Sequence, residues 1–157
     1  MKDLSVFEHL PDNARVWLYQ SNKELSLDIQ ENITKELQDF VASWAAHGSQ
    51  LFGAAAAINE RFLLVAVDEA KVPPSGCSID SSVRLIKTLE QKYGIDLFSR
   101  INVFLLEEGK IVPLPYSELS NCNENVLVFD NLVQQLGEVR NNWPVALRAS
   151  NFASVLT

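Results

Sequence analysis

The residues Phe62-Leu63-Leu64-Val65-Ala66-Val67 form an unbroken apolar run, and this run constrains the fold more than any other feature. A strand that is apolar on both faces is typical of the centre of a sheet. The segment 51–58 precedes it, separated by Asn59-Glu60, and contains four successive alanines. Since Asn tolerates positive φ, we expect a tight hairpin here. The small alanine side chains would let a helix or a ligand approach the sheet closely.

Hydrophobic periodicity predicts further elements on both sides of this hairpin. They are strands over 15–20, 101–106 and 126–129, and helices over about 27–47 and 78–93. Pro113 and Pro115 favour an edge strand or an extended loop for the residues after 109. The order strand, helix, strand, strand, helix, strand predicts an α+β fold, a ferredoxin-like split βαβ sandwich (β-α-β-β-α-β). We expect one domain over 1–157, with a core of about 14–106 and an irregular C-terminal extension of about 107–157.

This topology leads to a hypothesis about a binding site. If the first and third strands are parallel neighbours, their carboxyl ends meet at one edge of the sheet, and two helix N-termini meet there as well. Helix N-termini offer unpaired N–H groups and a positive dipole to an anion. The sequence therefore predicts a crevice for a small anionic or polar ligand, bounded by Gln20, Ser21, Asn22, Asp68, Ser75, Gly76, Cys77, Ser78 and Asp80.

A simpler interpretation explains the same loop residues. Ser, Asp and Gly near a helix start are what an ordinary capped helix contains. Capped helices are far more common than anion sites, so we rank this interpretation first. The function that best suits the sequence is a cytoplasmic non-catalytic binding or interaction module, and the crevice is the ligand site that we predict for it.

A small enzyme using the same crevice is the alternative function. Cys77 would be its nucleophile, because a helix N-terminus stabilises a thiolate, or Asp68 and Asp80 would act as acid and base or bind a metal. No base is evident for Cys77: His9 lies near the N-terminus, and the predicted topology places His47 at the opposite end of the sheet. The sequence contains no P-loop, dinucleotide-binding or nucleophile-elbow motif and no zinc-ligand spacing, so we predict no cofactor and no metal.

Composition excludes several partners. The formal net charge is -7, which disfavours nucleic acid and anionic membrane surfaces. No apolar run approaches the roughly 20 residues of a membrane span, and we expect a cytoplasmic protein with two reduced cysteines. Trp17 and Tyr19 share one face of a strand, so a homodimer or another protein partner is expected there if nothing covers that face.

The chain is similar to a small, uncharacterised bacterial family over most of its length. The resemblance is carried by 16–22, by the strand ending at Asp68, by Ser75-Gly76-Cys77-Ser78-Ile79-Asp80-Ser81-Ser82-Val83-Arg84, by 128–133 and by Trp143. Members carry the label "ABC transporter ATPase", which implies nucleotide binding. This sequence lacks the phosphate loop, the signature segment and the second carboxylate motif, and it is too short for such a domain. The resemblance therefore implies no catalytic residues.

Overall fold

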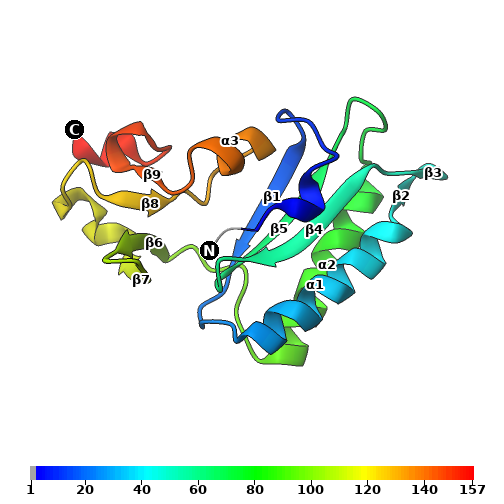
Figure 1. The fold of residues 1–157 in the computed structure, drawn as a ribbon, viewed down its shortest axis with the longest axis horizontal. Helices are drawn as coiled ribbons and strands as arrows, with labels where there is room; N and C mark the ends of the chain where they lie inside the picture. Colours follow the sequence, from blue (N-terminus) through cyan, green and yellow to red (C-terminus); the bar gives the residue numbers. More distant parts are fainter. Residues whose placement is uncertain (1–2) are drawn as a thin grey trace.

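The computed structural model describes residues 3–157 and consists of two lobes (Figure 1). The N-terminal lobe contains a three-stranded sheet and two long helices, and the C-terminal lobe contains a four-stranded sheet with short helical turns. The helices are α1 Leu27–Ala42, α2 Gly76–Tyr93 and α3 Leu136–Asn141; the strands are β1 Arg15–Gln20, β2 Ala45–Ala46, β3 Ser49–Gln50, β4 Gly53–Ile58, β5 Phe62–Val67, β6 Asn102–Glu107, β7 Lys110–Pro115, β8 Leu127–Phe129 and β9 Val145–Ala146.

β5 is the central strand of the first sheet, whose order is β1-β5-β4. All six of its residues are buried, so the prediction from the apolar run is confirmed. The predicted hairpin is also present, because β4 and β5 pair antiparallel from Gly53 opposite Val67 to Ile58 opposite Phe62.

The expected direction of the first strand is wrong. β1 is the neighbour of β5, but the two are antiparallel, with Arg15 opposite Val67 and Gln20 opposite Phe62. The reason is topological. The crossover through α1 makes β1 and β4 run in the same direction, and the hairpin reverses β5, so β5 is antiparallel to both strands between which it lies.

The second sheet accounts for the rest of the topology. β6 is formed as predicted, but it pairs with β7 and β8 in a sheet of order β7-β6-β8-β9 and not with β1. The α+β class is confirmed, whereas the fourth strand of a ferredoxin-like sheet is absent from the first sheet of the described chain. β6 therefore belongs with the residues expected to form an extension, and the predicted boundary at 106 falls inside a strand. β7 is an edge strand, as Pro113 and Pro115 indicated.

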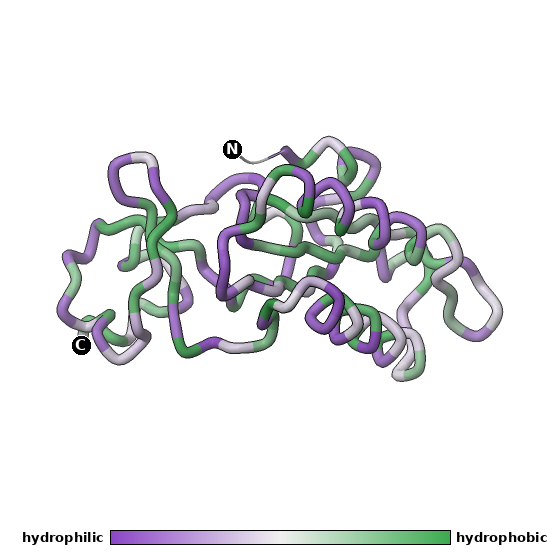
Figure 2. The backbone as a smooth tube through the Cα atoms, turned by 90° about the horizontal axis from the view of Figure 1, so that it is seen from below, coloured by the Kyte–Doolittle hydropathy of each residue, from purple (hydrophilic) through white to green (hydrophobic). Residues whose placement is uncertain are grey.

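Both faces of the first sheet are covered. Leu63, Val65 and Val67 of β5 face α1 and α2, and the alternate residues Phe62, Leu64 and Ala66 face the N-terminal turn and the C-terminal lobe. Figure 2 shows the strands as mostly apolar segments inside the molecule, while hydropathy alternates along the helices. An apolar side chain is therefore favoured at every position of β5.

Helix α1 packs on the alanine-rich strand β4, as the small side chains indicated. Ala57 N donates to Thr34 Oγ1 over 3.0 Å, so α1 also satisfies part of the free edge of the sheet. The helix ends at Ala42 and not at 47. The following residues form the small hairpin β2–β3, with positive φ at His47 and Gly48. His47 and Gly48 are therefore part of a hairpin turn and not of the helix predicted to reach 47.

The aromatic residues of β1 belong to the helix-facing core. Tyr19 is buried, and Trp17 packs edge-to-face on Trp44 with ring centroids 6.2 Å apart. Trp44 also donates its indole N–H to Ser78 O over 2.8 Å. The helices therefore cover the face that was expected to form a dimer interface if it were bare.

Candidate functional site

The two loops that were expected to form one crevice lie at opposite ends of the first sheet. Because β1 and β5 are antiparallel, Gln20-Ser21-Asn22 follows the end of β1 that is opposite Phe62, and Asp68 follows the end of β5 that is opposite Arg15. The helix N-termini are separated in the same way. Lys23 Nζ donates to Gly94 O at the C-terminus of α2, over 3.1 Å. The predicted crevice of nine residues is therefore not formed as a single site.

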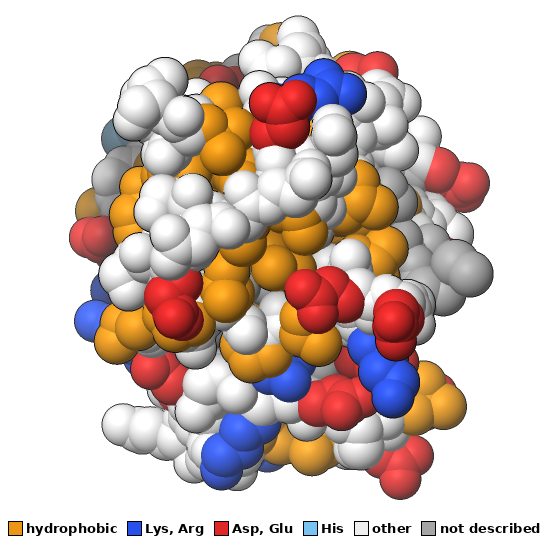
Figure 3. Space-filling model, turned by 90° about the vertical axis from the view of Figure 1, so that its left-hand side faces the viewer, with side chains coloured by type: hydrophobic (Ala, Val, Ile, Leu, Met, Phe, Trp, Pro, Cys, Tyr) orange, Lys and Arg blue, Asp and Glu red, His pale blue; other side chains and the backbone are white. Residues whose placement is uncertain are grey.

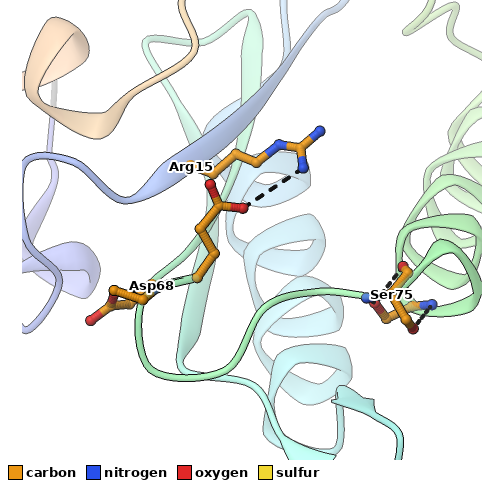
Figure 4. A network of polar contacts seen from close by, with 6 residues as sticks. Arg15, Asp68 and Ser75 are labelled. Carbon is orange, nitrogen blue, oxygen red and sulfur yellow. Dashed lines mark hydrogen bonds and ion pairs between the residues drawn. The ribbon is translucent and has the colours of Figure 1, made fainter.

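At the end that carries residues 68–78, which we call the capped end, the polar groups bond to one another. Ser75 Oγ accepts from Ser78 N over 3.1 Å, and Ser78 Oγ accepts from Ser75 N over 2.7 Å, a reciprocal N-cap. Asp68 Oδ1 accepts from Ala70 N over 3.2 Å. In Figure 4, Asp68 points away from Ser75, and a dashed line joins Arg15 to a carboxylate, that of Glu69, at 3.8 Å. The capped-helix interpretation is confirmed for Ser75 and Ser78.

The other predicted residues of this end give no enclosed site. Cys77 and Asp80 are exposed on the first turns of α2, and a Cβ added to Gly76 would meet no atom within 4 Å. His47 does not lie at the opposite end of the sheet from Cys77, as was predicted, because the bond from Trp44 to Ser78 places the C-terminal end of α1 beside the start of α2. His47 itself is exposed.

The loop after β1 fastens the two lobes together. Gln20 is buried; its Nε2 donates to Asn102 O over 2.8 Å, and its Oε1 accepts from Asn131 Nδ2 over 3.2 Å. Ser21 Oγ donates to Lys23 O over 2.6 Å, and Asn22 Oδ1 accepts from Asp96 N over 2.8 Å. These side chains form a structural joint in which their polar atoms are used within the chain.

Beside this joint lies a groove between the lobes with a volume of about 690 Å³. The β4–β5 turn, residues 59–61, forms one wall, and the β6–β7 hairpin, residues 106–112, forms the other. Phe129, Trp143 and Pro144 line the groove between the two walls, and Glu24 lies at its rim. We call this feature the interlobe groove. Its residues come from distant segments of the chain, which is why no sequence motif indicated it.

Asn59 is the unusual residue of the interlobe groove. It is 9% exposed, and its Oδ1 is buried without a hydrogen-bond partner. Asn59 and Glu60 have φ of 52° and 65°, as a tight hairpin turn requires. A buried polar atom without a partner is rare in folded proteins and calls for an explanation, such as a bound group. The only sequence signal was an Asn-Glu turn without the usual glycine.

The charged side chains around Asn59 differ in whether they already have partners within the protein. Arg61 donates to Asn22 O over 3.2 Å, and its guanidinium lies 4.9 Å from the centre of the Phe104 ring. Glu24, Glu60 and Lys110 are exposed, and within residues 3–157 none of the three forms an ion pair. The acidic groups of this rim are therefore available to a ligand, whereas the Arg61 guanidinium is partly occupied.

Two other hollows have a weaker claim to be a site. One of about 450 Å³ lies beside Arg15, whose guanidinium pairs with Glu69 and stacks 4.7 Å from the centre of the Trp17 ring. Another of about 500 Å³, beside Leu27 and Thr34, is also lined by Asn59. The first contains no orphaned buried atom among the described residues, and the second is an open depression along α1.

The outer surface of the C-terminal lobe also exposes apolar side chains. Figure 3 shows them near the middle of this view, with several acidic and basic groups gathered below and beside them. Among the described large apolar residues, Ile101 is the most exposed, at 74%, and its carbonyl oxygen accepts from the backbone N–H of Tyr116, which is 46% exposed. Nothing in the structure shows what covers this surface.

Neither a metal-binding cluster nor a membrane-spanning helix is present in the described part of the chain. Among residues 3–157, no group of three His, Cys, Asp or Glu side chains could hold a metal ion. Over the same residues, no helix has the length and apolar character that crossing a bilayer requires.

Comparisons with protein-family models, with curated proteins and with solved structures found no match to this chain.

Proposed function

We propose that the chain is a non-catalytic binding module of the cytoplasm that holds a small ligand in the interlobe groove. The proposal keeps the class of function that the sequence favoured and moves the site to the joint between the lobes. Both cysteines are free thiols, which fits a reducing compartment. Membership of the bacterial family labelled "ABC transporter ATPase" stays a prediction and contributes no site residue.

The shape and lining of the groove support this proposal. Small-molecule sites usually have volumes of roughly 300–1,000 Å³ and combine apolar and aromatic walls with a few polar groups. The interlobe groove has a volume of about 690 Å³, and the apolar groups of Leu106, Ile111, Trp143 and Pro144 lie opposite the polar β4–β5 turn. Such a site binds the body of a ligand by apolar contact and orients it by its polar end.

The observation that carries the proposal is the orphaned Asn59 Oδ1. Burying an acceptor without a donor costs roughly 1–3 kcal/mol. A ligand N–H or O–H group in the groove would recover this energy on binding, whereas the hydroxyl groups of the capped end already have partners. The unsatisfied acceptor therefore favours the groove over the predicted crevice.

Fragment screening by NMR tests the proposal. The full chain, labelled with ¹⁵N, is titrated with a library of rigid aromatic fragments while amide shifts are followed. We expect the perturbed amides to cluster in residues 59–61 and 106–112. Hits that gather instead around Ser75–Ser78, or that scatter over the outer C-terminal surface, would contradict the proposed site.

The enzyme alternative has less support. Cys77 and Asp80 are exposed, and the only side-chain hydrogen bond that Asp68 accepts within the described chain comes from Ala70 N in its own loop. A homodimer or another protein partner remains a prediction, for which the apolar surface around Ile101 is the candidate contact.

A further inference from the structure

The kind of ligand can be narrowed from the groups around Asn59. Resting on the proposed function, we infer that the interlobe groove binds an organic cation: an ammonium group attached to an apolar body that carries a ring. The ammonium group would lie at the β4–β5 turn, and the ring would lie against the apolar residues of the C-terminal lobe.

The polar part of the proposed site is a set of hydrogen-bond acceptors that have no cationic partner in the described chain. Asn59 Oδ1 can only accept a hydrogen bond, and it has no donor within the described chain. Glu60 is the next residue of the same turn, and Glu24 lines the same groove. Neither carboxylate is paired with a Lys or Arg of residues 3–157. Hydrogen bonds from a charged donor to such acceptors are roughly twice as strong as neutral ones.

The backbone of the turn holds these acceptors in place. Glu60 O accepts from Leu25 N over 2.7 Å, and Arg61 O accepts from Ser21 N over 2.6 Å. Both bonds tie the turn to the segment that follows β1, which is part of the joint between the lobes. The position of Asn59 is therefore set before any ligand arrives, which lowers the cost of binding.

The apolar part of the proposed site is formed by the second sheet. Leu106 is paired with Ile111 on β7 and with Leu127 on β8, so these side chains share one face of the sheet. Phe129 and Trp143 continue this face into the core, with ring centroids 4.9 Å apart. Leu106 and Ile111, which line the groove, are only half-buried, so part of this face remains open to solvent. An aromatic ring placed on it would be removed from water and gain the usual hydrophobic stabilisation.

An anionic ligand is the rival, because Arg61 and Lys110 also line the groove. Four observations favour the cation. The orphaned atom is an acceptor and would repel an anion; the guanidinium of Arg61 already donates to backbone carbonyls and stacks on Phe104. Lys110 lies on the exposed hairpin of the other wall, and the net charge of -7 steers cations toward the protein.

A series of three indoles that differ in charge tests the inference. Tryptamine is a cation, 3-ethylindole is neutral and indole-3-propionate is an anion, and all three carry the same ring. Their dissociation constants for the full chain are measured by calorimetry or NMR titration. We expect tryptamine to bind about tenfold more tightly than 3-ethylindole, and indole-3-propionate to bind most weakly. Amide shifts with tryptamine should map to residues 59–61 and 106–112.

Two variants identify the groups responsible. Glu60→Gln removes one carboxylate charge, and Asn59→Gly removes the acceptor while tolerating the positive φ of that position. Each should weaken tryptamine binding by about three- to tenfold and leave 3-ethylindole unchanged. Glu124→Gln, which removes the same charge outside the groove, is the matched control and should change neither constant. Circular dichroism of each variant establishes that it is folded.

The outcomes separate this inference from the proposed function. If all three indoles bind in the groove with equal affinity, the groove remains the binding site but its preference for a cation is overturned. If indole-3-propionate binds most tightly in the groove, the groove again remains the site, but its ligand is an anion. Amide shifts around Leu27 and Thr34 would place the cation in the depression along α1, which Asn59 also lines, and would overturn the groove as its site. If none of the indoles binds and no library fragment maps to the groove, both proposals fail.

Discussion

The two ends of the first sheet use their polar residues in opposite ways. At the capped end, Ser75 and Ser78 bond to each other, and Asp68 bonds within its own loop. At the groove end, the turn between β4 and β5 leaves Asn59 Oδ1 buried without a partner. The capped end has more serines and acids, but these groups satisfy one another. The Asn-Glu turn has fewer polar groups, yet it leaves an acceptor without a partner.

This difference shows that residue types near a helix start are poor guides to a binding site. Serine and aspartate are favoured there because they satisfy the free N–H groups of the helix. Once satisfied, they have little left for a ligand. An orphaned atom beside a hollow is the more informative sign, and it can be recognised only after the chain has folded.

The largest effect should come from breaking the contact between the lobes at the groove end. Phe62 is fully buried, and its ring lies 4.8 Å from that of Trp143 and 5.4 Å from that of Phe129, measured between centroids. Phe62→Ala should lower the free energy of unfolding by about 3–5 kcal/mol, measured by urea denaturation. Phe52→Ala, in a 43% exposed side chain next to the capped end, should cost about 1 kcal/mol or less. Similar losses for both would contradict a core shared by the lobes.

A glycine pair shows how closely the backbone is packed at the capped end. A Cβ on Gly53 would lie 2.8 Å from Ala66 O, whereas a Cβ on Gly76 would meet nothing within 4 Å. Gly53→Ala should therefore destabilise the protein by about 1–3 kcal/mol, and Gly76→Ala should be close to neutral. Thermal unfolding of the two variants measures the difference, and a neutral Gly53→Ala would show that β4 and β5 can move apart.

The cap itself should have a moderate effect. Ser75→Ala removes the side-chain acceptor at the start of α2 and should cost about 1 kcal/mol in a denaturation experiment. Ser81→Ala, in the same helix, removes an exposed hydroxyl that bonds to Cys77 O and should change stability by less than about 0.5 kcal/mol. Equal effects would mean that the serines of this end do not act as a cap.

At the groove end, we expect that removing a polar side chain does not lower the stability of the protein. Asn59→Gly removes an unsatisfied buried acceptor and keeps a turn with positive φ, so the variant should be neutral or more stable by up to about 1 kcal/mol. Asn123→Gly, which removes a side chain whose Oδ1 accepts from Asn125 N over 2.8 Å, should lower stability. A clear loss for Asn59→Gly would indicate that its oxygen has a partner in solution and would weaken the comparison between the two ends.

The smallest expected effect concerns the two thiols. Burial raises the pKa of the Cys122 thiol, and Glu107 and Glu118 raise it further, whereas Cys77 is exposed. Cys77 should therefore be alkylated several-fold faster than Cys122 at neutral pH, since the thiolate is the reactive form. Peptide mapping after iodoacetamide treatment measures both rates. If Cys77 reacts no faster, the activated-thiol alternative fails.

Local features of the fold could be predicted from the sequence, and long-range ones could not. The apolar run identified β5, the alanines of β4 indicated a close helix, and Pro113 and Pro115 indicated an edge strand. The predicted parallel direction of β1 and β5 is wrong, although the hairpin and the α1 crossover together determine that the two strands are antiparallel. That β6 joins a second sheet leaves no trace in its own residues, because Val103 and Phe104 suit either partner. The interlobe groove depends on that pairing.

One face of the first sheet is covered by two segments that are far apart in the sequence, which has a consequence for biosynthesis. Phe7 and Leu10 share a core with Val139 and Trp143, and Arg140 binds Asp12 over 2.8 Å. While the ribosome is still translating residues before 139, that face of β1, β5 and β4 lacks its cover. Exposed strand surface of this kind favours aggregation, so the nascent chain needs protection until Val139 and Trp143 have emerged.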